Sequence, residues 1–117
     1  MYFTNYDMIL PNYSIGEDCY KSIPYWARRY GKKAVVIGGK TAMDKAKSAI
    51  MEAVAGSGIE ISDFIWYGGD SNYENVEMLS RIGAVKNADI LFAVGGGRAV
   101  DTVKVLAVQL DKPVFDF

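Results

Sequence analysis

Residues 89–101, DILFAVGGGRAVD, give the clearest indication of the fold of this 117-residue chain. Its apolar first half reads as one buried strand, which ends in three consecutive glycines, and a helical pattern begins directly after them. Glycine lacks a Cβ and tolerates positive φ, so the backbone at Gly95, Gly96 and Gly97 can approach an oxyanion closely. The N–H groups and the positive dipole end of the next helix favour an anion at the same place. The stretch therefore predicts a phosphate-binding loop.

A similar unit occurs earlier, where AVVIGGK at residues 34–40 leads into a second helical pattern. Its unbroken apolar run is typical of a central parallel strand covered on both faces. Thr41, with Asp44 three residues later, predicts the N-cap of that helix, and the glycines at residues 56–58 predict its end. Because parallel strands end at the same edge of a sheet, we expect the Gly38–Gly39 loop to lie beside the loop at residues 95–97.

The remaining segments continue the alternation of strand and helix. Residues 59–67 read as a strand, and Ser71 with Glu74 has the spacing of a capping box for one helix at residues 73–86. A helix after the triple glycine and a final strand at residues 114–117 complete the pattern. Four strands alternating with three helices predict an α/β fold, a Rossmann-like doubly wound parallel sheet.

Before this unit, residues 1–16 predict an N-terminal hairpin or a pair of edge strands, and residues 18–30 predict a helix. The length fits one domain over residues 1–117. The last strand reaches Phe117, and the loop that should follow it would belong to the site. We therefore expect the sequence to be a piece of a longer chain, with a short natural domain as the alternative.

The composition excludes several classes of function. The 13 Lys and Arg residues nearly balance the 14 Asp and Glu residues, which argues against a nucleic-acid partner. The apolar runs are far shorter than the ~20 residues of a membrane span, and no secretory signal precedes them, so we expect no membrane partner and a cytoplasmic location. The chain has a single cysteine and no histidine, which excludes a disulfide within the chain and any metal site that needs its own histidine.

Known nucleotide motifs do not settle the ligand. Neither Gly-x-Gly-x-x-Gly nor the nucleoside-triphosphate P-loop occurs, and a bare glycine triplet also fits a tight connection. Asp101 and Lys104 share one face of the helix after the glycines. They form either an exposed ion pair or, with a dinucleotide in the loop, a pair in which Asp101 lies near the nicotinamide and Lys104 holds its orientation.

The segment GGGRAVDTVK at residues 95–104 resembles the Gly-Gly-Gly-x-x-x-Asp-x-x-Lys signature of the iron-containing alcohol dehydrogenase superfamily, most of all its glycerol dehydrogenase branch. Supporting segments are YSIG at residues 13–16, VVIGGKTA at residues 35–42 and YGGDSNYENV at residues 67–76. The resemblance spans essentially the whole chain.

This resemblance implies a dinucleotide-binding domain, here residues 1–117, followed in the family by a helical domain whose Asp and His residues hold zinc or iron. The implied reaction is hydride transfer between NAD or NADP and a small alcohol or polyol. The chain is similar to the first domain only, so the resemblance implies no catalytic or metal-binding residue in it. Whether the protein forms a homo-oligomer is left open by the sequence. The cofactor-binding residues that the resemblance implies are Gly39, Lys40, Gly95, Gly96, Gly97, Arg98, Ala99, Asp101 and Lys104.

The choice between NAD and NADP stays open in the sequence. In NAD-using relatives an acidic residue follows the first parallel strand, where this chain has Gly39 and then Lys40. The lysine either attracts a 2′-phosphate or is a solvated loop residue. Trp66, Tyr67 and Tyr73 could stack on adenine, although packing is the commoner role of aromatic residues at strand ends.

Two other functions compete with this interpretation. A dehydroquinate-synthase-like protein shares the fold and the use of NAD, and a Pro-Thr start to the loop after Phe117 would favour the dehydrogenase instead. The other is a stand-alone nucleotide- or phosphate-binding module without catalysis, which would remain folded and monomeric without further sequence.

Overall fold

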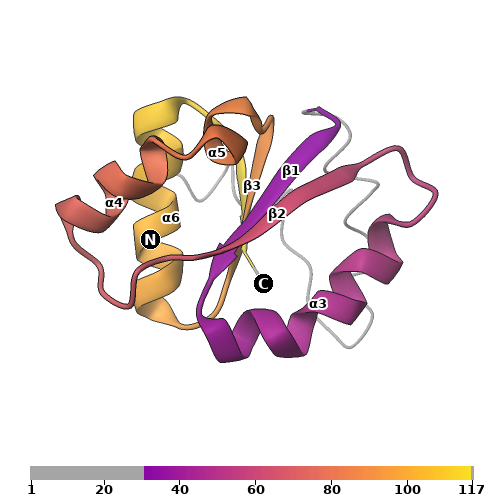
Figure 1. Cartoon of the computed structure of the whole chain (residues 1–117), viewed down its shortest axis with the longest axis horizontal. Coiled ribbons are helices and arrows are strands. Elements are labelled where there is room, and N and C mark those ends of the chain that lie inside the picture. Colours follow the sequence, from indigo (N-terminus) through magenta and orange to yellow (C-terminus); the bar gives the residue numbers. More distant parts are fainter. Residues whose placement is uncertain (1–30, 117) are drawn as a thin grey trace, which may run out of the picture.

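The computed structural model describes residues 31–116, which form a parallel sheet with helices on both faces (Figure 1). In chain order the elements are β1 (Lys33–Gly38), α3 (Lys40–Val54), β2 (Glu60–Trp66), α4 (Tyr73–Ser80), α5 (Gly83–Asn87), β3 (Ile90–Val94), α6 (Gly97–Leu110) and β4 (Val114–Asp116). The hairpin or edge strands predicted for residues 1–16 and the helix predicted within residues 18–30 lie outside the described residues.

The four strands are parallel and lie in the order β2-β1-β3-β4. α3 covers one face of the sheet, and α4, α5 and α6 cover the other (Figure 1). The two central strands are therefore buried on both sides, which explains why their sequences are continuous apolar runs. The predicted Rossmann-like α/β fold is confirmed.

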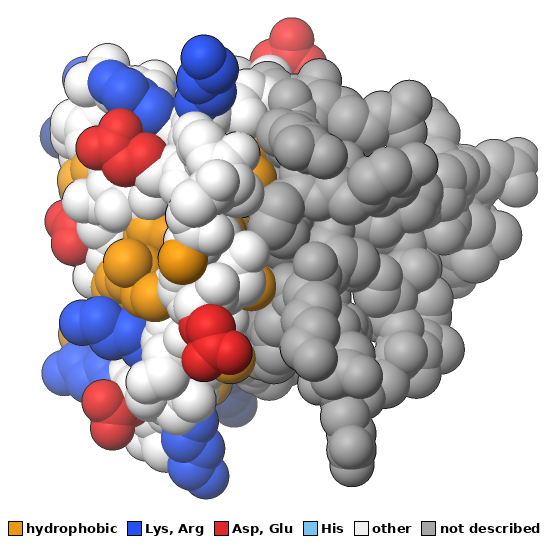
Figure 2. Space-filling model, turned by 90° about the vertical axis from the view of Figure 1, so that its right-hand side faces the viewer, with side chains coloured by type: hydrophobic (Ala, Val, Ile, Leu, Met, Phe, Trp, Pro, Cys, Tyr) orange, Lys and Arg blue, Asp and Glu red, His pale blue; other side chains and the backbone are white. Residues whose placement is uncertain are grey.

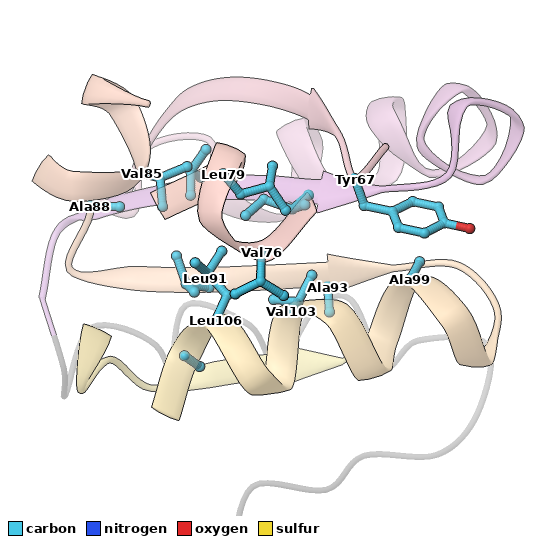
Figure 3. Packing of buried hydrophobic residues seen from close by; sticks show 13 residues of the cluster. Tyr67, Val76, Leu79, Val85, Ala88, Leu91, Ala93, Ala99, Val103 and Leu106 are labelled. Carbon is cyan, nitrogen blue, oxygen red and sulfur yellow. The ribbon is translucent and has the colours of Figure 1, made fainter. Parts of the chain in front are cut away.

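Successive side chains of β1 and β3 point to opposite faces of the sheet and pack in two separate hydrophobic clusters, one under each layer of helices. The cluster under α3 contains Ala34, Val36, Met43, Ala46, Ile50, Val54, Ile59, Ile90, Phe92, Val94 and Phe115. The cluster under α4, α5 and α6, drawn in Figure 3, contains Val35, Ile37, Tyr67, Val76, Leu79, Val85, Ala88, Leu91, Ala93, Ala99, Val103, Leu106 and Ala107. The two clusters hold β1 and β3 in place, and so fix the positions at which the loops after these strands begin.

The structure corrects both predicted helix caps. The N-cap of α3 is Gly39, not Thr41, and no side chain caps it. The Gly39 N–H donates to the carbonyl oxygen of Val94 over 3.2 Å, which keeps Gly39 extended and starts the helix immediately after it. The N-cap of α4 is Asn72, one residue after the predicted Ser71, and its side chain accepts from the N–H of Asn75 over 2.8 Å.

The single helix predicted for residues 73–86 is also wrong, because the structure forms two helices there. α4 stops at Ser80, and α5 starts at Gly83 after Ile82 adopts an extended conformation. The apolar spacing nevertheless continues across the break, since Leu79 and Val85 are buried in the same cluster. Periodicity alone therefore could not reveal the interruption.

Candidate functional site

The loops that follow β1 and β3 meet at the carboxyl edge of the sheet, as the parallel arrangement predicts. The hydrogen bond from Gly39 to Val94 joins them directly. On the other loop, Gly95 has a φ of 133°, and a Cβ placed on it would lie 3.4 Å from the Gly39 nitrogen and 3.3 Å from the Ala99 Cβ. Two segments distant in sequence thus form one continuous backbone surface.

Two helices begin on this surface. α3 starts after Gly39 and α6 after Gly96; neither N-cap makes a side-chain hydrogen bond, and neither first turn contains an acidic residue. Figure 1 shows both helices starting at the same lower edge of the sheet. The first N–H groups of a helix have no partner within the helix, and the helix dipole adds partial positive charge beside them. The edge can therefore accept an anionic group.

The glycines at this edge fall into two groups. Gly38 and Gly95 are required by the fold, since a Cβ on Gly38 would lie 2.0 Å from the carbonyl oxygen of Val94 and Gly95 has positive φ. At Gly39, Gly96 and Gly97, a Cβ would meet nothing within 4 Å. These three positions therefore leave room for a ligand to approach the backbone closely. The site residues therefore fit a phosphate-containing cofactor.

The remaining residues that the sequence singled out lie along the first half of α6. Arg98 and Asp101 are exposed, so their side chains are available at the surface. Ala99 is buried against Gly95, so only its N–H can serve a ligand. The Lys104 ammonium forms an ion pair with the Asp116 carboxylate at 3.4 Å, in addition to the pair with Asp101 that the sequence left open as an alternative. Lys104 thereby links α6 to the end of β4.

Lys40 and the aromatic residues at the end of β2 complete the edge on its other side. The Lys40 Nζ lies 4.2 Å from the ring centroid of Trp66, a cation–π contact that the sequence did not reveal. Tyr67 is 9% exposed and packs in the cluster of Figure 3, which confirms a packing role for it. Tyr73 is 87% exposed. Of the three aromatic residues, Trp66 alone combines partial exposure with a charged partner among the described residues.

Metal ligands are not grouped in this part of the chain. Within residues 31–116, no set of three Asp, Glu, Cys or His side chains is arranged to hold a metal ion. The residues present therefore do not fit the zinc or iron that the resemblance implies. In the same residues, no helix has the combination of length and apolar character needed to cross a membrane.

The fold is that of a Rossmann-like α/β domain, with two helix starts that lack side-chain caps at its carboxyl edge. The sequence profile of iron-containing alcohol dehydrogenase matches residues 11–117. The chain therefore belongs to the iron-containing alcohol dehydrogenase family, which confirms the resemblance seen in its glycine segment.

Individual relatives agree with this assignment. A glycolaldehyde reductase of Halobacterium salinarum is 28% identical over 84% of this chain and 27% of its own length. A glycerol-1-phosphate dehydrogenase [NAD(P)+] of Thermoplasma volcanium is 30% identical over 70% of this chain and 23% of its own length. The crystal structure of glycerol dehydrogenase from Schizosaccharomyces pombe matches with a TM-score of 0.71 and 17% identity, over 83% of this chain and 24% of that chain. The chain thus spans about a quarter of the length of these relatives.

Proposed function

We propose that this chain is the NAD(P)-binding domain of a metal-dependent dehydrogenase that acts on a small alcohol or polyol. The observation that carries the proposal is the set of three glycines, Gly39, Gly96 and Gly97, whose Cβ positions are open and which lie at two uncapped helix starts. The similarity to a glycerol-1-phosphate dehydrogenase [NAD(P)+] supports the same class.

In this proposal the backbone N–H groups at the start of α6 donate to the pyrophosphate oxygens of the cofactor, and the α6 dipole and the exposed Arg98 add positive charge. Gly39 lets the adenosine half pass close to the sheet edge, and Asp101 and Lys104 lie towards the nicotinamide half. The bound cofactor supplies the hydride acceptor or donor. The sequence has no histidine, so we assign zinc or iron, and the polarisation of the substrate oxygen, to residues outside this chain.

Calorimetric titration of the 117-residue chain with NADH and with NADPH tests this function. We expect weak binding without turnover. A Gly97→Ala variant should weaken binding about tenfold or more, since the Cβ of a first-turn residue tilts towards the helix N-terminus, where the phosphate would lie, and displaces hydrogen bonds to a charged group.

Gly83→Ala is the matched control for this variant. Gly83 is also the first residue of a helix with open space around its Cβ position, but it begins α5, away from the glycine loops. Both substitutions should keep or raise the urea midpoint, because alanine favours helix over glycine. The proposal is wrong if millimolar NADH and NADPH give no binding heat, or if the two variants bind cofactor equally well. Inorganic pyrophosphate binding as tightly as either dinucleotide would instead indicate a phosphate module.

A further inference from the structure

An ion pair joins α6 to the end of β4 beside the glycine loops. The Lys104 ammonium lies 3.4 Å from the Asp116 carboxylate, and the two side chains are 44% and 41% exposed. Asp116 is the last residue of β4 and lies in register with Ala93 of β3, which comes two residues before Gly95. This register places a carboxylate at the carboxyl edge, one strand away from the loop at residues 95–97.

The charges around this pair come from two elements that are separate in the chain. Lys104 lies about two turns into α6, and helical side chains tilt towards the N-terminus of their helix, which here is the glycine loop. Asp101 is exposed on the same face of α6, about one turn nearer to that loop. Beyond the first turn of α6, the charged side chains of α6 and β4 are Asp101, Lys104 and Asp116, which sum to one negative charge.

The opposite end of the carboxyl edge carries the opposite charge. There Lys40, Lys47 and Asp44 line an open pocket of about 320 Å³ between α3 and the end of β2, and they sum to one positive charge. Figure 2, viewed from the side on which α3 lies, shows Lys and Arg side chains next to a small exposed apolar patch. A ligand that spans the edge therefore meets positive charge at the β2 end and negative charge at the β4 end.

This difference in charge bears on the redox state of a dinucleotide. In the proposed function, the adenosine half passes Gly39 after β1, and the pyrophosphate lies at the start of α6 after β3. Because β3 lies between β1 and β4, the nicotinamide half of an extended dinucleotide falls on the β4 side. The oxidised nicotinamide ring carries one positive charge, and uptake of a hydride makes it neutral. A negative charge near the ring thus stabilises the oxidised form more than the reduced form.

We propose that Asp116 shifts the preference of this site towards the oxidised dinucleotide, through the negative charge that it adds beside the nicotinamide ring. This inference rests on the proposed function and adds to it a residue that discriminates between the two redox states of the cofactor. Lys104 holds the Asp116 carboxylate in place and offsets part of its charge, while Asp101 keeps the sum of the three charges negative.

Calorimetric titration of the chain with NAD+ and NADH, and with NADP+ and NADPH, tests this inference through the ratio of oxidised to reduced affinity. Asp116→Asn should lower this ratio about threefold, as the loss of one partly exposed charge near the ring allows. Asp116→Glu should retain the ratio of the parent chain. A variant that only disturbs the fold would lower both affinities together and leave the ratio unchanged.

Asp111→Asn is the matched control, because it removes the same charge from the opposite end of α6. Asp111 is the C-cap of α6 with a φ of 54°, a conformation that asparagine also adopts. This control should leave the ratio unchanged. Lys104→Gln should raise the ratio, because it removes the positive charge of the same pair.

The two pair variants separate the effect of charge from the loss of the ion pair. Both Asp116→Asn and Lys104→Gln break the pair, but only an effect of charge moves the ratio in opposite directions. An unchanged ratio in either folded variant, or a shift of both in the same direction, overturns this inference and leaves the proposed function standing. Absence of binding by all four dinucleotides overturns the proposed function itself.

Discussion

Asp89 forms hydrogen bonds at the amino edge of the sheet, which is the edge opposite the glycine loops. Its carboxylate accepts hydrogen bonds from the backbone N–H groups of Lys32 and Lys33, each at 3.1 Å. These two hydrogen bonds, that of Lys33 first, lower the pKa of the Asp89 carboxyl from its ordinary value, because they favour the charged form. On the same edge, the Lys112 ammonium donates to the carbonyl oxygens of Lys86 and Ala88.

An Asp89→Asn variant should therefore show pH-dependent destabilisation. A carboxyl whose pKa is lower in the folded state adds stability above its unfolded pKa and loses it as the pH falls through the folded value. We expect a lower urea midpoint than in the parent chain at pH 7, and convergence of the two midpoints as the pH falls below about 4, the usual aspartate pKa. A difference that stays constant across this range would show that the charge of Asp89 does not stabilise the fold.

Individual glycines illustrate what a sequence reveals at this scale. The pair Gly38–Gly39 and the triplet at residues 95–97 correctly predicted the positions of the loops. Residue type could not distinguish the glycines that the fold requires from those with open space around the Cβ position. The separation depends on tertiary distances, such as the 2.0 Å between a Cβ on Gly38 and the Val94 oxygen, against open space at Gly39.

At the scale of the helix and the strand, long apolar runs were the most informative pattern. They predicted β1 and β3 to within one or two residues, because both strands are covered on both faces. Helix starts were harder to predict. Thr41 and Ser71 have the right side chains, but the hydrogen bond of Gly39 to Val94 starts α3 earlier, and Asn72 competes with Ser71 for the same task.

This correction gives a direct test at α4. Asn72→Ala should lower the free energy of unfolding by about 1 kcal/mol, because it removes the side-chain oxygen that accepts from the Asn75 N–H. Ser71→Ala, the neighbouring control, should change it by less than about 0.5 kcal/mol, as expected for an exposed residue outside the cap. Urea denaturation followed by circular dichroism measures both; the reverse order of effects would restore Ser71 as the cap.

For the whole molecule, the parallel order of strands made the shared edge predictable before any contact was known. The contacts that refine the site were not predictable. Lys40 meets Trp66 because β1 and β2 pair in a register that places Trp66 opposite Gly38, and Lys104 meets Asp116 because β4 ends beside α6. Such pairs depend on strand register and helix placement, which residue spacing does not encode.

The proposed function requires that a dinucleotide binds across the glycine loops at the carboxyl edge. Backbone amide chemical shifts of the ¹⁵N-labelled chain, followed during titration with NADPH, test it most directly. We expect the largest shifts at Gly39, Lys40 and residues 95–99, with the amino-edge amides of Lys32 and Lys33 unchanged. Shifts confined to the amino edge, or none at millimolar NADPH, would contradict it.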